Sequence, residues 1–97
     1  MRLRLTPRAV QDLTDIADYL HAESPAGALN VRAAILESLQ LLTEAPRMGR
    51  AQSIEGVRKH VTRRYSYLVY YAIDEVADEI AVLTIQHPAR QHPTRDR

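Results

Sequence analysis

The sequence predicts an α+β domain in which a hairpin of two helices packs on a small antiparallel sheet, in the order β-α-α-β-β-β. Two observations carry this prediction. Apolar residues recur at helical spacing between Thr6 and Ala45, and after Gly56 they recur at the two-residue spacing of strands. Since the two helical segments are adjacent, they are expected to cover one face of a sheet built from the other segments.

A short strand is predicted at residues 2–6, because leucines and arginines alternate there. Thr6-Pro7 is expected to begin the first helix, with the threonine as cap and the proline in the first turn. Ser24-Pro25 repeats this signal, so a second helix follows almost at once and forms an antiparallel hairpin with the first. The second helix should end at Ala45, because the residue before a proline disfavours helical geometry.

Three further strands are predicted after Gly56, at residues 57–62, 65–73 and 79–86. A turn at Arg63-Arg64 and a charged hairpin loop at 74–78 separate them. The last two strands are apolar on both faces, which suits central positions in the sheet. Residues 47–54 are expected to be a loop, and the first strand is expected at an edge of the sheet. This pairing puts His87 at the same end of the sheet as Arg63-Arg64.

The length of 97 residues predicts a single domain spanning 1–97, with a loosely ordered tail at about 88–97. A hydrophobic fraction of 45% and a charged fraction of 26% are ordinary for a globular domain. The absence of Cys excludes disulfides and thiolate chemistry. The start of the chain lacks a continuous apolar run, and no stretch approaches the length of a membrane span. We therefore expect a cytoplasmic protein without a membrane partner.

No cofactor and no metal site are expected. The four histidines lack a nearby carboxylate at the spacing of metal ligands. The sequence also contains neither a glycine-rich phosphate loop nor a recognisable Ser/His/Asp arrangement.

Charge is distributed unevenly although the net charge is only +1. Residues 12–23 contain four acidic residues and no Lys or Arg, whereas residues 47–64 contain six basic residues and one acidic residue. The basic residues are Arg47, Arg50, Arg58, Lys59, Arg63 and Arg64. Such a stretch is either a solvated surface or a binding site for an acidic partner or a phosphate backbone, and the sequence leaves both interpretations open.

Short motifs follow one another along most of the chain. They are L-T-P-R-A-V-Q-D-L with D-I-A-D-Y, then L-T-E-A-P-R-M-G-R, G-V-R-K-H, Y-S-Y-L-V-Y-Y and I-Q-H-P-A-R. In this order and spacing they resemble the RelE/ParE superfamily of toxins from type II toxin–antitoxin systems, on its ParE-like branch. The resemblance implies a cognate antitoxin, ParD-like or similar, that wraps the toxin in a hetero-oligomer and alone contacts DNA. The helix hairpin offers a groove for an amphipathic helix, and the edge strand a place for strand addition.

Two activities compete within this superfamily. RelE-like members are similar to ribosome-dependent ribonucleases that cut mRNA, whereas ParE-like members resemble inhibitors of DNA gyrase. Metal-independent RNA cleavage needs a base, an acid and cations for the phosphate. The candidates here are Arg58, His60, Arg64 and His87. The last three strands hold a single Lys, and no aromatic residue follows Tyr71, so this set is thinner than the RelE-like pattern.

We therefore expect a ParE-like toxin that inhibits growth by acting on DNA gyrase and is not an enzyme. An mRNA interferase and an inactive antitoxin-binding module are the alternatives. Target binding is expected at His87 and Arg90. Antitoxin binding is expected at Arg47, Arg50, Arg58, Lys59, Arg63 and Tyr65. Arg58 has a second interpretation, in which it anchors loop 47–55 by pairing with Glu55 or an acidic helix residue, and the tyrosines of 65–71 are most simply sheet residues.

Overall fold

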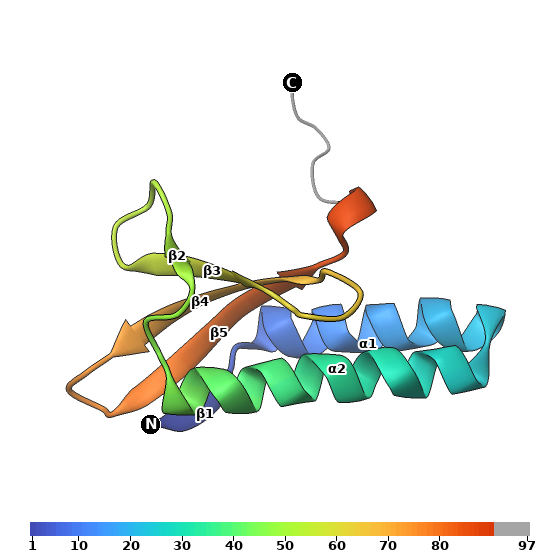
Figure 1. Ribbon diagram of the computed structural model, residues 1–97, viewed down its shortest axis with the longest axis horizontal. Helices are drawn as coiled ribbons and strands as arrows, with labels where there is room; N and C mark the ends of the chain where they lie inside the picture. The colour runs from blue at the N-terminus through green and yellow to red at the C-terminus, as the bar shows by residue number, and fades with distance from the viewer. Residues whose placement is uncertain (91–97) are drawn as a thin grey trace.

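Two helices and a five-stranded sheet form the two layers of the computed structural model, which describes residues 1–90 (Figure 1). Both helices lie against the same face of the sheet, as the sequence predicts. In chain order the elements are β1 (Arg2–Leu5), α1 (Pro7–Glu23), α2 (Pro25–Glu44), β2 (Arg50–Ala51), β3 (Val57–Val61), β4 (Leu68–Asp74), β5 (Glu79–Gln86) and the 3-10 helix η1 (Pro88–Arg90).

The sheet is mixed, with the strand order β1-β5-β4-β3-β2, so β1 occupies an edge as predicted. The expectation of a wholly antiparallel sheet is wrong in one respect, because β1 pairs with β5 in parallel, with Leu3 opposite Ile80. The physical reason is the helix hairpin, which returns the chain to the end where β1 begins. There the Met1 amino group donates to the Thr43 carbonyl at 3.2 Å. Hence β3 and β5 run in the same direction as β1.

The predicted capping residues begin both helices. Thr6 accepts a hydrogen bond from the Ala9 N–H at 3.1 Å, and its hydroxyl donates to the Val82 carbonyl at 2.9 Å, which ties the start of α1 to β5. Ser24 is the single residue between the helices. Its N–H donates to the Leu20 carbonyl at 2.7 Å, and its hydroxyl accepts from the Gly27 N–H at 3.1 Å.

The hydrophobic core lies between the helix pair and the two central strands. Its largest fully buried side chains are Tyr71, Ile35, Leu39, Leu42, Ile80, Val69 and Val82. Because side chains alternate along a strand, Val69 and Tyr71 of β4 both point towards the helices. Their partners across the ladder, His60 and Arg58 of β3, share that face, and Lys59 points to the opposite face.

The stretch predicted as a loop at 47–54 contains β2. This two-residue strand pairs with β3, with Arg50 opposite Lys59 and Ala51 opposite Arg58. It forms the second edge of the sheet. Two residues are too few to show the alternation of apolar and polar side chains that indicates a strand.

The strand predicted at 65–73 begins only at Leu68. Tyr65 and Ser66 have φ angles of 70° and 56°, which lie in the left-handed region and cannot belong to a strand. Thr62 closes this turn, since its N–H donates to the Tyr67 carbonyl and its hydroxyl accepts from the Tyr67 N–H, both at 2.9 Å. Residues 62–67 are therefore a tight turn with Arg63 and Arg64 exposed at its tip.

The segment predicted as a tail begins with η1, and residues 91–97 lie outside the described part of the chain. Among residues 1–90, neither α1 nor α2 has the length and apolar character needed to cross a membrane.

Candidate functional site

Tyr71 holds the loop between α2 and β2 against the core. Its hydroxyl donates to the Pro46 carbonyl at 2.6 Å and accepts from the Gly49 N–H at 2.9 Å. Burial raises the pKa of Tyr71, so the hydroxyl stays protonated and keeps its role as a donor. The sequence indicated only a sheet residue here, because the main-chain partners of a tyrosine leave no mark in a sequence.

Arg58 fixes the same loop from β3. Its Nη1 donates to the Gly49 carbonyl at 2.6 Å and to the Arg47 carbonyl at 3.3 Å. The anchoring interpretation is therefore right about the loop and wrong about the partner. Arg58 pairs neither with Glu55 nor with an acidic helix residue in the described part of the chain.

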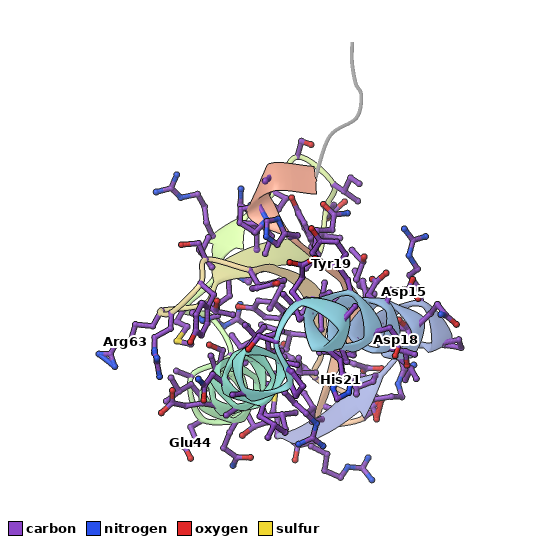
Figure 2. The ribbon with its side chains drawn as sticks, turned by 90° about the vertical axis from the view of Figure 1, so that its right-hand side faces the viewer. Asp15, Asp18, Tyr19, His21, Glu44 and Arg63 are labelled. Carbon is purple, nitrogen blue, oxygen red and sulfur yellow. The ribbon has the colours of Figure 1, made fainter. Side chains whose placement is uncertain are left out.

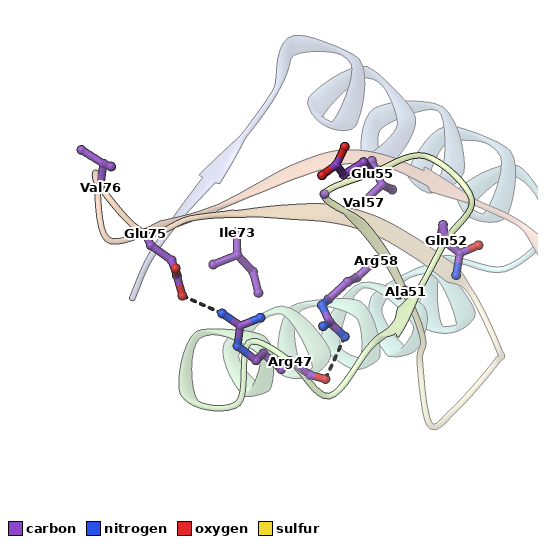
Figure 3. A pocket seen from close by; sticks show the side chains of 10 residues that line it. Arg47, Ala51, Gln52, Glu55, Val57, Arg58, Ile73, Glu75 and Val76 are labelled. Carbon is purple, nitrogen blue, oxygen red and sulfur yellow. Dashed lines mark hydrogen bonds and ion pairs between the residues drawn. The ribbon is translucent and has the colours of Figure 1, made fainter.

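A pocket of about 450 Å³ lies between the β2–β3 loop and the β4–β5 hairpin (Figure 3). Val57 and Ile73 contribute apolar wall, Arg58 reaches in from β3, and Glu55 lies on the loop side. On the other side Arg47 Nη2 pairs with Glu75 Oε2 at 2.6 Å. That pair is mostly exposed and contributes little to stability, but it links the two segments that frame the pocket.

A second hollow, of about 350 Å³, runs between α1 and α2. Its lining is mostly apolar and includes Val10, Leu13, Ile16, Ile35 and Leu36. Val10 is 49% exposed and Leu36 is 38% exposed, so apolar side chains of both helices face solvent here. The groove expected on the helix hairpin is thus present.

The four ribonuclease candidates do not converge. Arg58 lies opposite Tyr71, and His60 lies two residues further along β3. From strand spacing, the backbones of His60 and His87 are roughly 12 Å apart and those of Arg58 and His87 further still. Across residues 1–90, no three His, Asp or Glu side chains gather closely enough to hold a metal ion.

Arg64 and His87 lie at the end of the sheet where the sequence placed them, since Leu68 at the start of β4 pairs with Gln86 at the end of β5. The Arg64 guanidinium lies 5.2 Å from the centre of the Tyr65 ring. His87 meets the Tyr67 ring edge-on at 5.2 Å, and its Nδ1 accepts from the Ala89 N–H at 3.0 Å. The side chain of Arg90, the other residue expected at the target, lies outside the described atoms.

The six residues expected at the antitoxin are spread over the molecule. Arg47, Arg50 and Arg58 surround the loop after α2, Lys59 points to the other face of the sheet, and Arg63 and Tyr65 lie in the β3–β4 turn. In Figure 2 the helices are seen nearly end-on, with Arg63 on one flank and the α1 acids Asp15 and Asp18 on the other.

One member of the acidic stretch has a structural role. Asp12 of α1 accepts hydrogen bonds from the Thr84 hydroxyl and from the Ile85 N–H, the latter at 2.9 Å. The pairing of β1 with β5 ends at Leu5 and Val82. The hydrogen bonds to Asp12 therefore cover the following part of β5, which would otherwise be a free edge.

His60, like Tyr71, has a pKa that its surroundings shift. Its Nε2 is buried and has no hydrogen-bond partner among the described residues. Burial lowers the pKa of His60 from its ordinary value of 6.5, because the charged imidazolium loses hydration. A neutral His60 is the form that the folded protein favours.

We expect the melting temperature to fall as the pH is lowered from about 7.5 to about 5. Above the ordinary pKa of 6.5, His60 is neutral in both states. Below it, the unfolded chain binds a proton that the folded chain resists, so acid favours unfolding. Scanning calorimetry should show a smaller decrease for His60→Gln, whereas His21→Gln, on the exposed part of α1, should match the wild type. An unchanged pH dependence in His60→Gln contradicts this role.

Comparisons with known proteins agree with the fold. The model of a family described as the ParE toxin of the type II toxin–antitoxin system parDE matches residues 3–92. The Sinorhizobium fredii protein named "Putative toxin Y4kP" is 32% identical over 92 residues, which cover 95% of this chain and 93% of that protein. The chromosomal ParDE system of P. aeruginosa contains a chain that matches with a TM-score of 0.76 and 28% identity, covering 90% of this chain and 95% of its own. A chain of the intact E. coli RelBE complex shares the fold, with a TM-score of 0.69, 16% identity and coverages of 92% and 98%.

Proposed function

The chain belongs to the ParE toxin family of type II toxin–antitoxin systems, and from this we propose that it is a cytoplasmic inhibitor of growth that acts on DNA gyrase. A cognate antitoxin neutralises it in a hetero-oligomer. The observation that carries the proposal is the ParE family match over residues 3–92. The chain of the ParDE system also superposes with a higher TM-score, 0.76, than the E. coli RelBE chain, 0.69, which supports the same branch.

The arrangement of the ribonuclease candidates supports inhibition by binding over catalysis. General acid–base cleavage needs its acid and its base within hydrogen-bonding reach of one phosphodiester. Arg58 and His87 lie far apart along the strands, and His60 and His87 are separated by the width of the central strands. A protein that acts by occupying a surface of its target needs no such convergence, and we place His87 and Arg90 on the surface that meets the target.

The groove between the helices is the proposed docking site for the antitoxin. An amphipathic helix presents apolar side chains every three to four residues, and these fit a groove whose walls are apolar on both sides. Val10 and Leu36 are the exposed groove residues that such a helix would cover. Additional contacts with the antitoxin are proposed at Arg47, Arg50, Arg58, Lys59, Arg63 and Tyr65.

Inducing the protein alone in bacteria, while thymidine and methionine incorporation are followed together, tests the target. We expect DNA synthesis to fall first, and the purified protein to inhibit supercoiling by gyrase. If protein synthesis stops first, the target is the ribosome and mRNA. If growth is unaffected, the chain is an inactive antitoxin-binding module.

A double variant separates the two activities at the level of residues. His60 and Arg64 belong only to the ribonuclease set, so His60→Gln/Arg64→Ala should remain as toxic as the wild type. Loss of toxicity in a variant that still folds and still binds the antitoxin would contradict the gyrase assignment. The folded state is checked by circular dichroism and antitoxin binding by calorimetry.

A further inference from the structure

Arg58 is a half-buried cation without a counter-ion in the described structure. Its Nη1 donates to two neutral carbonyls, and Nε and Nη2 have no acceptor among residues 1–90. A half-buried guanidinium has lost part of its hydration, and an anion that pairs with it compensates for this loss. Nothing in the loop that it holds supplies that anion.

The unused donors belong to one edge of the guanidinium. The N–H bond of Nε and one N–H bond of Nη2 point in the same direction, and the two together can donate to both oxygens of a carboxylate. The bonds from Nη1 to the carbonyls of Arg47 and Gly49 fix the plane of this fork before any ligand arrives. Preorganisation of this kind reduces the entropy lost on binding.

The pocket around Arg58 restricts what can reach this edge. Val57 and Ile73 line it with apolar surface, and Val76, fully exposed on the hairpin, extends that surface outwards. Glu75 is paired with Arg47 at 2.6 Å, and the other charged residues of the lining are Arg58 and Glu55, which form no ion pair in the described structure. The apolar side chains and the Glu55 carboxylate disfavour a phosphate, which is more strongly hydrated, more than they disfavour a peptide carboxylate.

We propose that this pocket is a carboxylate-binding subsite that receives an Asp or Glu side chain of the antitoxin, held by both donors on the free edge of Arg58. The proposal rests on the proposed function, because it takes the antitoxin as the partner. It assigns Arg58 two tasks that use different atoms. Nη1 stabilises the loop after α2, and Nε with Nη2 recognises the partner.

A double-mutant cycle tests the subsite in the toxin–antitoxin complex. Arg58→Lys keeps the charge and can still donate to a loop carbonyl, but it lacks the planar fork. We expect this variant to lose antitoxin affinity at least tenfold, equivalent to about 1.4 kcal/mol. Each carboxylate of the antitoxin segment that contacts the toxin is then changed to its amide. One of these changes should weaken the wild-type complex by a similar factor and leave the Arg58→Lys complex unchanged.

The control is Arg8→Lys, because Arg8 is an exposed arginine of α1 and lines neither the Arg58 pocket nor the groove between the helices. It should change the affinity by less than twofold. If the wild-type complex forms but no antitoxin carboxylate is coupled to Arg58 by more than twofold, the subsite is overturned and the toxin assignment is unaffected. If the wild-type proteins do not associate, the proposed function itself has failed.

A measurement on the wild-type protein covers the case in which Arg58→Lys does not fold. The Nε–Hε resonance of Arg58 should move downfield when the antitoxin binds, and this shift should be missing with one of the carboxylate-to-amide variants of the antitoxin. A resonance that stays in place overturns the proposal, as does a shift that an oligonucleotide produces and the antitoxin does not.

Discussion

Tyr71→Phe is expected to lower the free energy of unfolding by about 1–3 kcal/mol. The change removes one oxygen from a fully buried side chain and leaves the Pro46 carbonyl and the Gly49 N–H without their partner. Each is a main-chain group near the core, where an unmade hydrogen bond costs most. For a domain of this size, thermal unfolding should show a decrease of several degrees for each kcal/mol lost, roughly 4–8 °C.

Tyr70→Phe is the matched control, because it makes the same chemical change in the same strand on the half-buried outer face. It should alter stability by less than about 0.5 kcal/mol. Gly49→Ala tests the loop from its other side, since a Cβ at this position would lie 2.5 Å from the Tyr71 hydroxyl oxygen and 3.0 Å from the Lys59 carbonyl oxygen. Unfolding midpoints equal to the wild type in both Tyr71→Phe and Gly49→Ala would show that this contact does not hold the loop.

The helices could be predicted because the signals that begin and end them are local. Thr6-Pro7 and Ser24-Pro25 combine a side-chain acceptor with a residue that needs no intrahelical donor, and both act within three residues of themselves. The last strand was predicted with the same bounds as β5 for a similar reason, since a charged hairpin and a following proline enclose its apolar run.

The loop strand and the start of β4 could not be predicted because distant residues determine them. β2 forms because Tyr71 and Arg58, which are 22 and 9 positions from Gly49 in sequence, hold the preceding loop against the sheet. In the β3–β4 turn no Gly or Asn marks the left-handed positions, which are taken by Tyr65 and Ser66. The hydrogen bonds of Thr62 compensate for this conformation, and a threonine in a strand-like pattern does not indicate a turn.

The candidate site was predicted only in outline for a related reason. Arg58 could be recognised as a residue at the loop, but its acceptors are backbone carbonyls, which every residue possesses and no sequence pattern identifies. Likewise, the sequence identifies Asp12 only as one of several acidic residues on an exposed helix face. Only the ending of β1 at Leu5 gives it the free edge of β5 to cover.

Leu36→Glu is expected to reduce antitoxin affinity at least a hundredfold, about 2.8 kcal/mol. Leu36 lines the groove between the helices and is 38% exposed, so a glutamate can be accommodated in the free protein by turning into solvent. In the complex the same carboxylate would be buried against apolar side chains without a counter-ion, which is strongly unfavourable. Calorimetric titration of the antitoxin measures the loss, and in cells the variant should remain toxic when the antitoxin is co-expressed.

Leu41→Glu separates groove occupancy from a general effect of negative charge on α2. Leu41 is 42% exposed on the same helix but does not line the groove, so the substitution adds the same charge at a similar exposure. Its affinity for the antitoxin should stay within a few-fold of the wild type, because the carboxylate remains in water in both states. If the two variants weaken the complex equally, the antitoxin responds to the charge of the helix pair and does not bury an apolar face in the groove. That result would move the docking site to another surface.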